Sequence, residues 1–79
     1  MREAAGDHAR IATTYSNLGN IYKELGNHAL ALNYYTLCLK TFEELKEKRG
    51  LVQAYINMGE LYFEMKDFED AFIYLSKAI

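Results

Sequence analysis

The sequence predicts an all-α chain of two tandem helix-turn-helix repeats, a fragment of an α-solenoid with four antiparallel helices. Three observations predict this fold class. The chain matches itself when residues 6–39 are laid over residues 46–79, hydrophobic residues recur at helical spacing within each copy, and proline is absent. Self-similarity at a fixed period of this length is typical of stacked helical arrays.

The two copies agree at spaced positions along their whole length. Identical residues stand at Tyr15 and Tyr55, Asn17 and Asn57, Gly19 and Gly59, Tyr22 and Tyr62, Glu24 and Glu64, Ala31 and Ala71, and Tyr34 and Tyr74. We therefore expect one domain over residues 1–79. Repeat 1 covers 8–47, and repeat 2 covers 48–79 and is truncated at its C-terminal end.

The first copy predicts helices near 8–25 and 28–47. The hydrophobic stripe of the first helix is Ile11, Tyr15, Leu18, Tyr22 and Leu25. The stripe of the second is Ala31, Tyr35, Cys38, Phe42 and Leu45. Asn27 follows Gly26 and is a good N-cap, so the sequence predicts a turn between the two helices.

The second copy predicts helices near 50–65 and 68–79, with Asp67 as the N-cap of the last. The first of these carries Leu51, Tyr55, Met58, Tyr62 and Met65, and the last carries Phe68, Ala71, Phe72, Leu75, Ala78 and Ile79. Gly50 is the favoured turn between the repeats. Alternatively, the charged helix formers of 43–49 continue the helix through it.

Two glycines inside the predicted helices need a structural reason, because glycine costs a helix interior roughly 0.8–1 kcal/mol relative to alanine. Gly19 and Gly59 stand at matching places, and so do Ala31 and Ala71 on the second helix of each copy. Small residues on facing helices allow a close backbone approach. We expect Gly19 to pack against Ala31 and Gly59 against Ala71.

Composition and charge exclude several functions. The formal net charge of -2 gives no basic surface for nucleic acid, and no apolar run approaches the length of a membrane span. His8 and His28 form no metal-binding pair, and Cys38 lies in an apolar stripe with no histidine partner. We expect a cytoplasmic protein without a cofactor or metal, and not an enzyme.

At this point the pattern resembles the tetratricopeptide repeat family. The residues that carry the resemblance are Tyr15, Leu18, Gly19, Tyr22, Ala31, Tyr35 and Cys38, then Tyr55, Met58, Gly59, Tyr62, Ala71, Leu75 and Ala78. The forty-residue period is similar to that of Leu-Gly-Asn-repeat adaptors and, less closely, to that of kinesin light chains and bacterial peptide-sensing regulators. The family's usual period is six residues shorter, and its proline near the end of the second helix is missing here.

The resemblance implies a protein-binding scaffold whose first helices line a concave groove for a peptide or a partner helix. In this sequence the corresponding faces carry Thr13, Ser16, Asn17, Asn20, Lys23 and Glu24, and in the second copy Gln53, Ile56, Asn57, Glu60, Phe63 and Glu64. In similar repeats the shared asparagine reads the backbone of an extended peptide, which an amide can do because it offers both donors and an acceptor. The alternative is that Asn17 and Asn57 bond only a neighbouring carbonyl or solvent.

The charge of the groove indicates its ligand. Lys23 is the only base there, against Glu24, Glu60 and Glu64, so a neutral or basic segment fits better than an acidic one.

Two alternatives to a foreign ligand stay open. The first is a self-associating module, which forms a homodimer or higher assembly through open repeat ends, with domain swapping as one form of it. The second is a sensory input fragment of a larger signalling protein. The expected self-association face is Phe72, Leu75 and Ile79.

Overall fold

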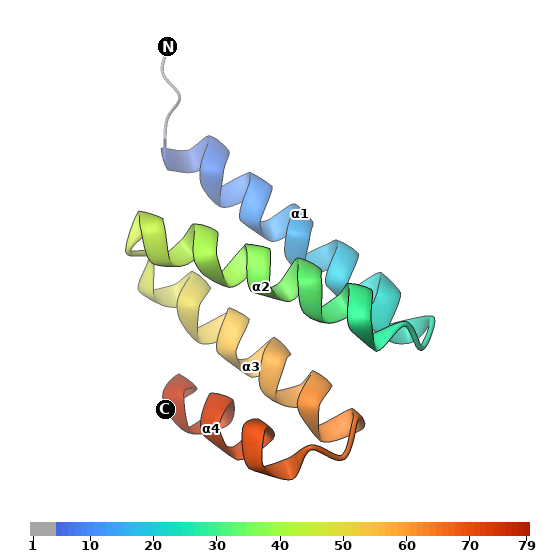
Figure 1. The fold of residues 1–79 in the computed structure, drawn as a ribbon. Helices are drawn as coiled ribbons and strands as arrows, with labels where there is room; N and C mark the ends of the chain where they lie inside the picture. The colour runs from blue at the N-terminus through green and yellow to red at the C-terminus, as the bar shows by residue number, and fades with distance from the viewer. Residues whose placement is uncertain (1–4) are drawn as a thin grey trace.

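The computed structural model describes residues 5–79, which form four α-helices and no strand. They are α1 (Ala5–Glu24), α2 (His28–Leu45), α3 (Lys48–Glu64) and α4 (Phe68–Ala78). Figure 1 shows them side by side in chain order, with α1 and α4 at opposite ends of the array. Each helix packs on its neighbours in the chain, and α1 also reaches α3. The all-α, helix-turn-helix prediction is confirmed.

All three turns between the helices have the same construction. Each of the first three helices is followed within two residues by a left-handed residue: Gly26 (φ 82°), Lys46 (φ 56°) and Lys66 (φ 64°). The next residue caps the following helix through its side chain, which accepts a hydrogen bond from the backbone N–H three residues on. These N-caps are Asn27, Glu47 and Asp67. The predicted caps Asn27 and Asp67 are therefore confirmed.

The prediction for Gly50 was wrong in both of its forms. Helix α2 ends at Leu45, and the turn between the repeats is at Lys46 and Glu47. Gly50 lies in the first turn of α3, where an added Cβ would collide with the ring of Phe42. Gly50 therefore allows α3 to approach α2 closely and does not reverse the chain.

The core is centred on α2, which contributes to both buried clusters. The first cluster contains Ala12, Cys38, Phe42 and Ala54. The second contains Ala31, Tyr35, Met58 and Leu61. The predicted α2 stripe is thus largely confirmed, because Ala31, Tyr35, Cys38 and Phe42 are all buried. Since each cluster joins α2 to α3, the two repeats share one continuous core.

Gly19 has another partner than the alanine we expected, whereas Gly59 lies beside both Leu75 and the expected Ala71. A Cβ added at Gly19 would lie 2.5 Å from Cδ1 of Tyr35, so Gly19 packs on that ring and not on Ala31. A Cβ added at Gly59 would lie 2.6 Å from Cγ of Leu75 and 3.4 Å from the carbonyl oxygen of Ala71. Close approach is confirmed, but large side chains use the space that the glycines leave.

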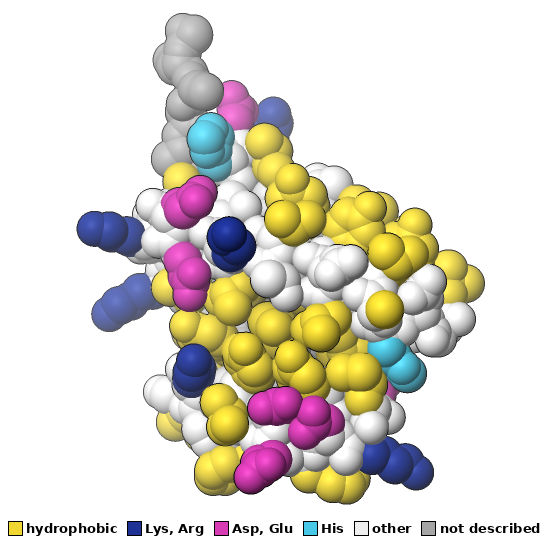
Figure 2. Space-filling view, viewed as in Figure 1, with side chains coloured by type: hydrophobic (Ala, Val, Ile, Leu, Met, Phe, Trp, Pro, Cys, Tyr) yellow, Lys and Arg dark blue, Asp and Glu magenta, His cyan; other side chains and the backbone are white. Residues whose placement is uncertain are grey.

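The two outer helices expose part of their hydrophobic stripes. On α1, Ile11 and Leu25 are exposed, and on α4 so are Phe68, Phe72, Leu75 and Ile79. Figure 2 shows a row of hydrophobic side chains along the outer edge of the α1 end of the array. These faces are open because α1 and α4 each have packed neighbours on one side only.

Candidate binding groove

The predicted groove residues lie on α1 and α3, and the structure brings only part of them into contact. Thr13, Ser16, Asn17, Asn20, Lys23 and Glu24 are on α1, and Gln53, Ile56, Asn57, Glu60, Phe63 and Glu64 are on α3. The structure joins these two sets by two polar contacts between the helices. The residues in each contact hold the two helices in place and are therefore less available to a ligand.

The first contact is a hydrogen-bonded chain of three side chains. Asn57 Nδ2 donates to Ser16 Oγ at 2.9 Å across the two helices, and Asn57 Oδ1 accepts from Gln53 Nε2 at 3.1 Å. Asn57 is only 7% exposed, the only buried polar residue among those that the structure describes. An amide has two N–H donors and two acceptor positions, so one of each stays unused. Asn57 therefore fixes the spacing of α1 and α3 and keeps limited capacity for a ligand.

The second contact is an ion-pair cluster at the other end of the groove. Lys23 Nζ lies 3.9 Å from Glu60 Oε1 and 4.0 Å from Glu64 Oε2, and its side chain is 15% exposed. His28 Nε2, at the start of α2, lies 3.7 Å from Glu64 Oε1. The one base of the groove thus faces two carboxylates of the same molecule. It is poorly placed to bind an anionic group of a ligand.

Asn20 is hydrogen-bonded to a residue of the core. Its Oδ1 accepts a hydrogen bond from the hydroxyl of Tyr35, whose ring is buried. Burial, with smaller contributions from nearby Glu60 and Glu64, raises the pKa of Tyr35 to about 12, so its hydroxyl stays a donor at neutral pH. Sequence reasoning took Tyr35 only as a core residue. One difference between the copies could have indicated a role for its hydroxyl: a tyrosine stands where the second copy has Leu75.

The remaining predicted residues are exposed or half-buried and take no part in the hydrogen bonds and ion pairs between α1 and α3. Asn17, Glu24 and Phe63 are exposed, and Ile56 is half-buried. Thr13 is exposed as well, but its hydroxyl donates to the carbonyl of Ala9 one turn earlier. Asn17 and Asn57 occupy matching places in the two copies, yet one is exposed and the other buried. The sequence repeat could not show this difference, because it depends on which helix lies alongside.

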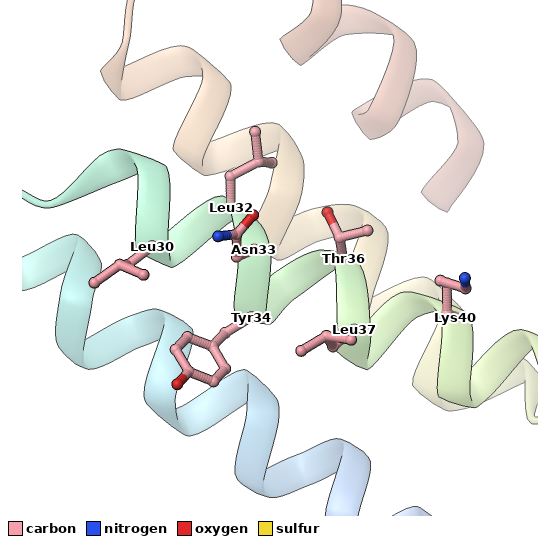
Figure 3. Close-up of a pocket in the computed structure, with 7 residues that line it drawn as sticks. All are labelled: Leu30, Leu32, Asn33, Tyr34, Thr36, Leu37 and Lys40. Carbon is pink, nitrogen blue, oxygen red and sulfur yellow. The ribbon is translucent and has the colours of Figure 1, made fainter.

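A separate hollow lies on the outer face of α2 and contains none of the predicted groove residues. Its volume is ≈ 580 Å³, and Figure 3 shows its lining side chains along a single helix. They are Leu30, Leu32, Asn33, Tyr34, Thr36, Leu37 and Lys40. Because the walls come from one helix, the hollow presents no converging polar groups of the kind that fix a small ligand.

Two other kinds of site are absent from residues 5–79. Within residues 5–79 no group of three or more His, Cys, Asp or Glu side chains could hold a metal ion. In the same range no helix has both the length and the apolar character needed to cross a bilayer. Cys38 is buried, and burial raises the pKa of its thiol to about 11, which keeps it protonated and a weak nucleophile at neutral pH.

Comparison with known proteins agrees with this architecture. The family model for the tetratricopeptide repeat matches residues 1–44 and again residues 10–79. The chain belongs to the tetratricopeptide repeat family. It is also 38% identical over 69 residues to regulatory protein RapG of Bacillus subtilis (strain 168). That alignment covers 86% of this chain and 19% of the relative, so the chain spans about a fifth of RapG. No solved structure matches the chain significantly.

Membership in the tetratricopeptide repeat family fixes the function class. Such repeats are scaffolds for contacts between proteins, so the chain is a protein-interaction module. The resemblance stated from the sequence is confirmed.

Proposed function

We propose that this tetratricopeptide repeat chain holds a peptide segment or a helix of a partner protein in the groove between α1 and α3. The partner segment is neutral or basic. The observation that carries the proposal is the charge balance of the groove, where Glu24, Glu60 and Glu64 are at least partly exposed and Lys23 is already paired. Electrostatic complementarity then disfavours an acidic segment.

Side chains for recognising an extended backbone support the same proposal. Asn17 is exposed on α1 and Gln53 is exposed on α3, where Gln53 bonds Asn57 and leaves one donor and one acceptor position of the Asn57 amide unused. These amides can accept from N–H groups and donate to carbonyl groups of a peptide. Phe63, exposed at the end of α3, adds an apolar contact for a partner side chain. We further propose that this binding takes place in the cytoplasm.

Two other functions follow from particular observations. The exposed hydrophobic side chains of α1 and α4 favour self-association. The similarity to a much longer protein described as regulatory favours a role as the input fragment of a larger signalling protein. The input role is compatible with a ligand in the groove, because it uses other parts of a longer chain. Head-to-tail self-association covers Asn17 and Phe63, so it competes with a ligand that binds these residues.

The charge preference can be tested with three synthetic peptides that differ only in carrying lysine, serine or glutamate at the same positions. We expect fluorescence anisotropy to show the tightest binding for the lysine peptide, with a preference that shrinks as salt is raised. The double variant Glu60→Gln/Glu64→Gln should lose most of the preference for the lysine peptide. Glu43→Gln/Glu44→Gln, on exposed α2 positions outside the groove, is the matched control. Equal binding of all three peptides would contradict the proposal.

Backbone recognition is tested with Asn17→Ala. If the amide bonds a peptide backbone, this variant should weaken binding by ~1–3 kcal/mol, because a buried group of the ligand loses its partner. Asn33→Ala, an exposed asparagine on the outer face of α2, should leave binding unchanged. Asn57→Ala is unsuitable for this purpose, since it also removes the bonds to Ser16 and Gln53. An affinity for Asn17→Ala equal to that of the parent chain would rule this contact out.

A further inference from the structure

The outer side of α1 repeats the side of α3 that packs on α2. We call Ile11, Leu18, Ile21 and Leu25 the α1 end face. Their counterparts in the second copy are Leu51, Met58, Leu61 and Met65, all of which pack into the core clusters shared with α2. Leu61 is 0% exposed, whereas Ile21 at the matching place is 54% exposed. Among the described residues, no helix covers the α1 end face in the way that α2 covers its counterpart on α3.

The outer side of α4 provides the complementary half. We call Phe72, Leu75 and Ile79 the α4 end face. Their counterparts in the first copy are Leu32, Tyr35 and Leu39, which belong to or pack against the cluster that joins α2 to α3. Tyr35 is 1% exposed, whereas Phe72 is 72% and Leu75 37% exposed. In the first copy, α3 covers the surface that α4 leaves open.

We propose that copies of this chain associate head to tail, with the α4 end face of one molecule packed against the α1 end face of the next. The arrangement is the one that α2 and α3 already have within a single molecule. The two end faces lie at opposite ends of the array, so one molecule cannot join them to each other (Figure 1). A second copy supplies both halves in the register that the chain uses internally. Such a contact is heterologous and allows open growth.

The polar contacts of the internal junction are not reproduced between copies, and this limits the strength of the association. Within the molecule Ser16 meets Asn57. Between copies the matching pair is Ile56 and Asn17, so burial of Asn17 leaves its amide without that partner. Within the molecule Lys23 lies beside Glu60 and Glu64. Between copies the matching residues are Phe63 of one molecule and Asn20 and Glu24 of the next, so no ion pair forms there. We therefore expect a weak, concentration-dependent assembly.

Blocking one end at a time tests the direction of the contact. Ile21→Glu places a charge on the α1 end face and Phe72→Glu on the α4 end face, both at exposed positions away from the core. Each variant alone should sediment as a 9.1 kDa monomer. An equimolar mixture should form a 1:1 dimer that grows no further, because each variant retains the end that the other lacks. Circular dichroism should show that both variants are folded.

A second variant separates a specific junction from general stickiness. Ile56→Ser/Phe63→Lys makes the chain less apolar but recreates the two polar contacts between copies, with Asn17 and with Glu24. We expect it to lower the dissociation constant of the assembly about tenfold, the effect of roughly one buried polar pairing. Association through exposed apolar surface alone would instead weaken.

Three results would overturn the proposal. The first is a constant 9.1 kDa species for the parent chain across a hundredfold concentration range in sedimentation equilibrium. The second is a dimer that persists in Ile21→Glu and is lost only in Phe72→Glu, which would show two-fold pairing of α4. The third is an equimolar mixture of the two variants that stays monomeric.

Discussion

At the scale of single residues, Tyr35 connects three of the four helices. Its ring lies against Gly19 of α1 and forms a buried cluster with Met58 and Leu61 of α3. Its hydroxyl donates to Asn20 at the edge of the groove. The same side chain thus belongs to the core and positions a residue of the candidate site. Its matching residue, Leu75, has neither a hydroxyl nor a covering helix.

Gly19 and Gly59 occupy matching positions in the two copies, so the same substitution at Gly59 is a control for the substitution at Gly19. Gly19→Ala gains ~1 kcal/mol of helix propensity but forces a methyl group onto the fixed ring of Tyr35, at a cost of ~1–3 kcal/mol. Gly59→Ala meets Leu75, which is 37% exposed and can move aside. We expect Gly19→Ala to be the less stable variant by ~1–2 kcal/mol in urea unfolding. A Gly19→Ala chain as stable as Gly59→Ala would contradict this packing.

The sequence indicated that both glycines mark close approach, but not which side chain approaches them. Ala31 and Tyr35 lie one turn apart on the same stripe of α2, so periodicity alone could not separate them. The choice depends on the offset between the two helices along their axes. Residue spacing within one helix contains no information about that offset.

At the scale of elements, the three turns share one geometry although their sequences differ. Gly26 adopts a left-handed conformation without steric cost, whereas Lys46 and Lys66 adopt it with a side chain. In each turn the N–H of the left-handed residue bonds the carbonyl three residues back, and the N–H of the next residue bonds the carbonyl five residues back. These bonds satisfy the last carbonyls of the helix and hold the turn closed.

Replacing the two lysines tests the cost of that conformation. A left-handed residue with a Cβ costs roughly 1–2 kcal/mol, partly offset by the greater entropy that glycine loses on folding. We expect Lys46→Gly and Lys66→Gly each to stabilise the chain by up to about 1 kcal/mol in thermal or urea unfolding. Lys40→Gly, at an exposed position inside α2, should destabilise it by ~1 kcal/mol. Destabilisation by all three changes would refute the left-handed assignment.

Helix identity and order were predictable because amphipathic stripes and N-caps are local signals. The turn between the repeats was missed for an equally local reason. Glycine is the usual residue at such a turn, so Gly50 was favoured over Lys46, while the helix-forming residues around Lys46 gave no sign of an interruption. Glycine is required at position 50 because a side chain there would collide with the ring of Phe42. That contact exists only once α2 and α3 are packed together.

At the scale of the whole molecule, stability is unevenly distributed. Helix α2 packs against both α1 and α3, and it supplies buried side chains to both core clusters. Helix α4 packs against α3 alone, and Ala71 is its one buried residue. Regions with few buried apolar contacts open at lower free energy than the core.

Amide hydrogen exchange should show this order. We expect α4 to exchange fastest of the four helices in dilute solution, and α2 slowest, because opening α4 disrupts a single helix pair. Measurement by mass spectrometry on peptides from 28–45 and 68–78 compares the two helices directly. Equal protection of α2 and α4 in dilute solution would show that the molecule unfolds only as one unit.

The groove could be predicted only in part from the sequence. Its residues and its charge follow from the two aligned copies, which place Asn17 and Asn57 at one position. The bond between Asn57 and Ser16 and the ion pairs of Lys23 join residues of different repeats. A comparison of one repeat with the other cannot reveal contacts between them. For that reason the buried state of Asn57 was not foreseen.

The uniform turn has a consequence for how such a chain can change in length. Gly26 with Asn27 and Lys66 with Asp67 form equivalent turns, one full repeat apart. A recombination between two gene copies that joins codon 66 of one to codon 27 of the other adds a complete repeat, and the reverse exchange removes one. Neither event interrupts a helix or alters a capping residue. The protein is therefore open to growth by duplication in whole structural units, with every new corner already compatible with its neighbours.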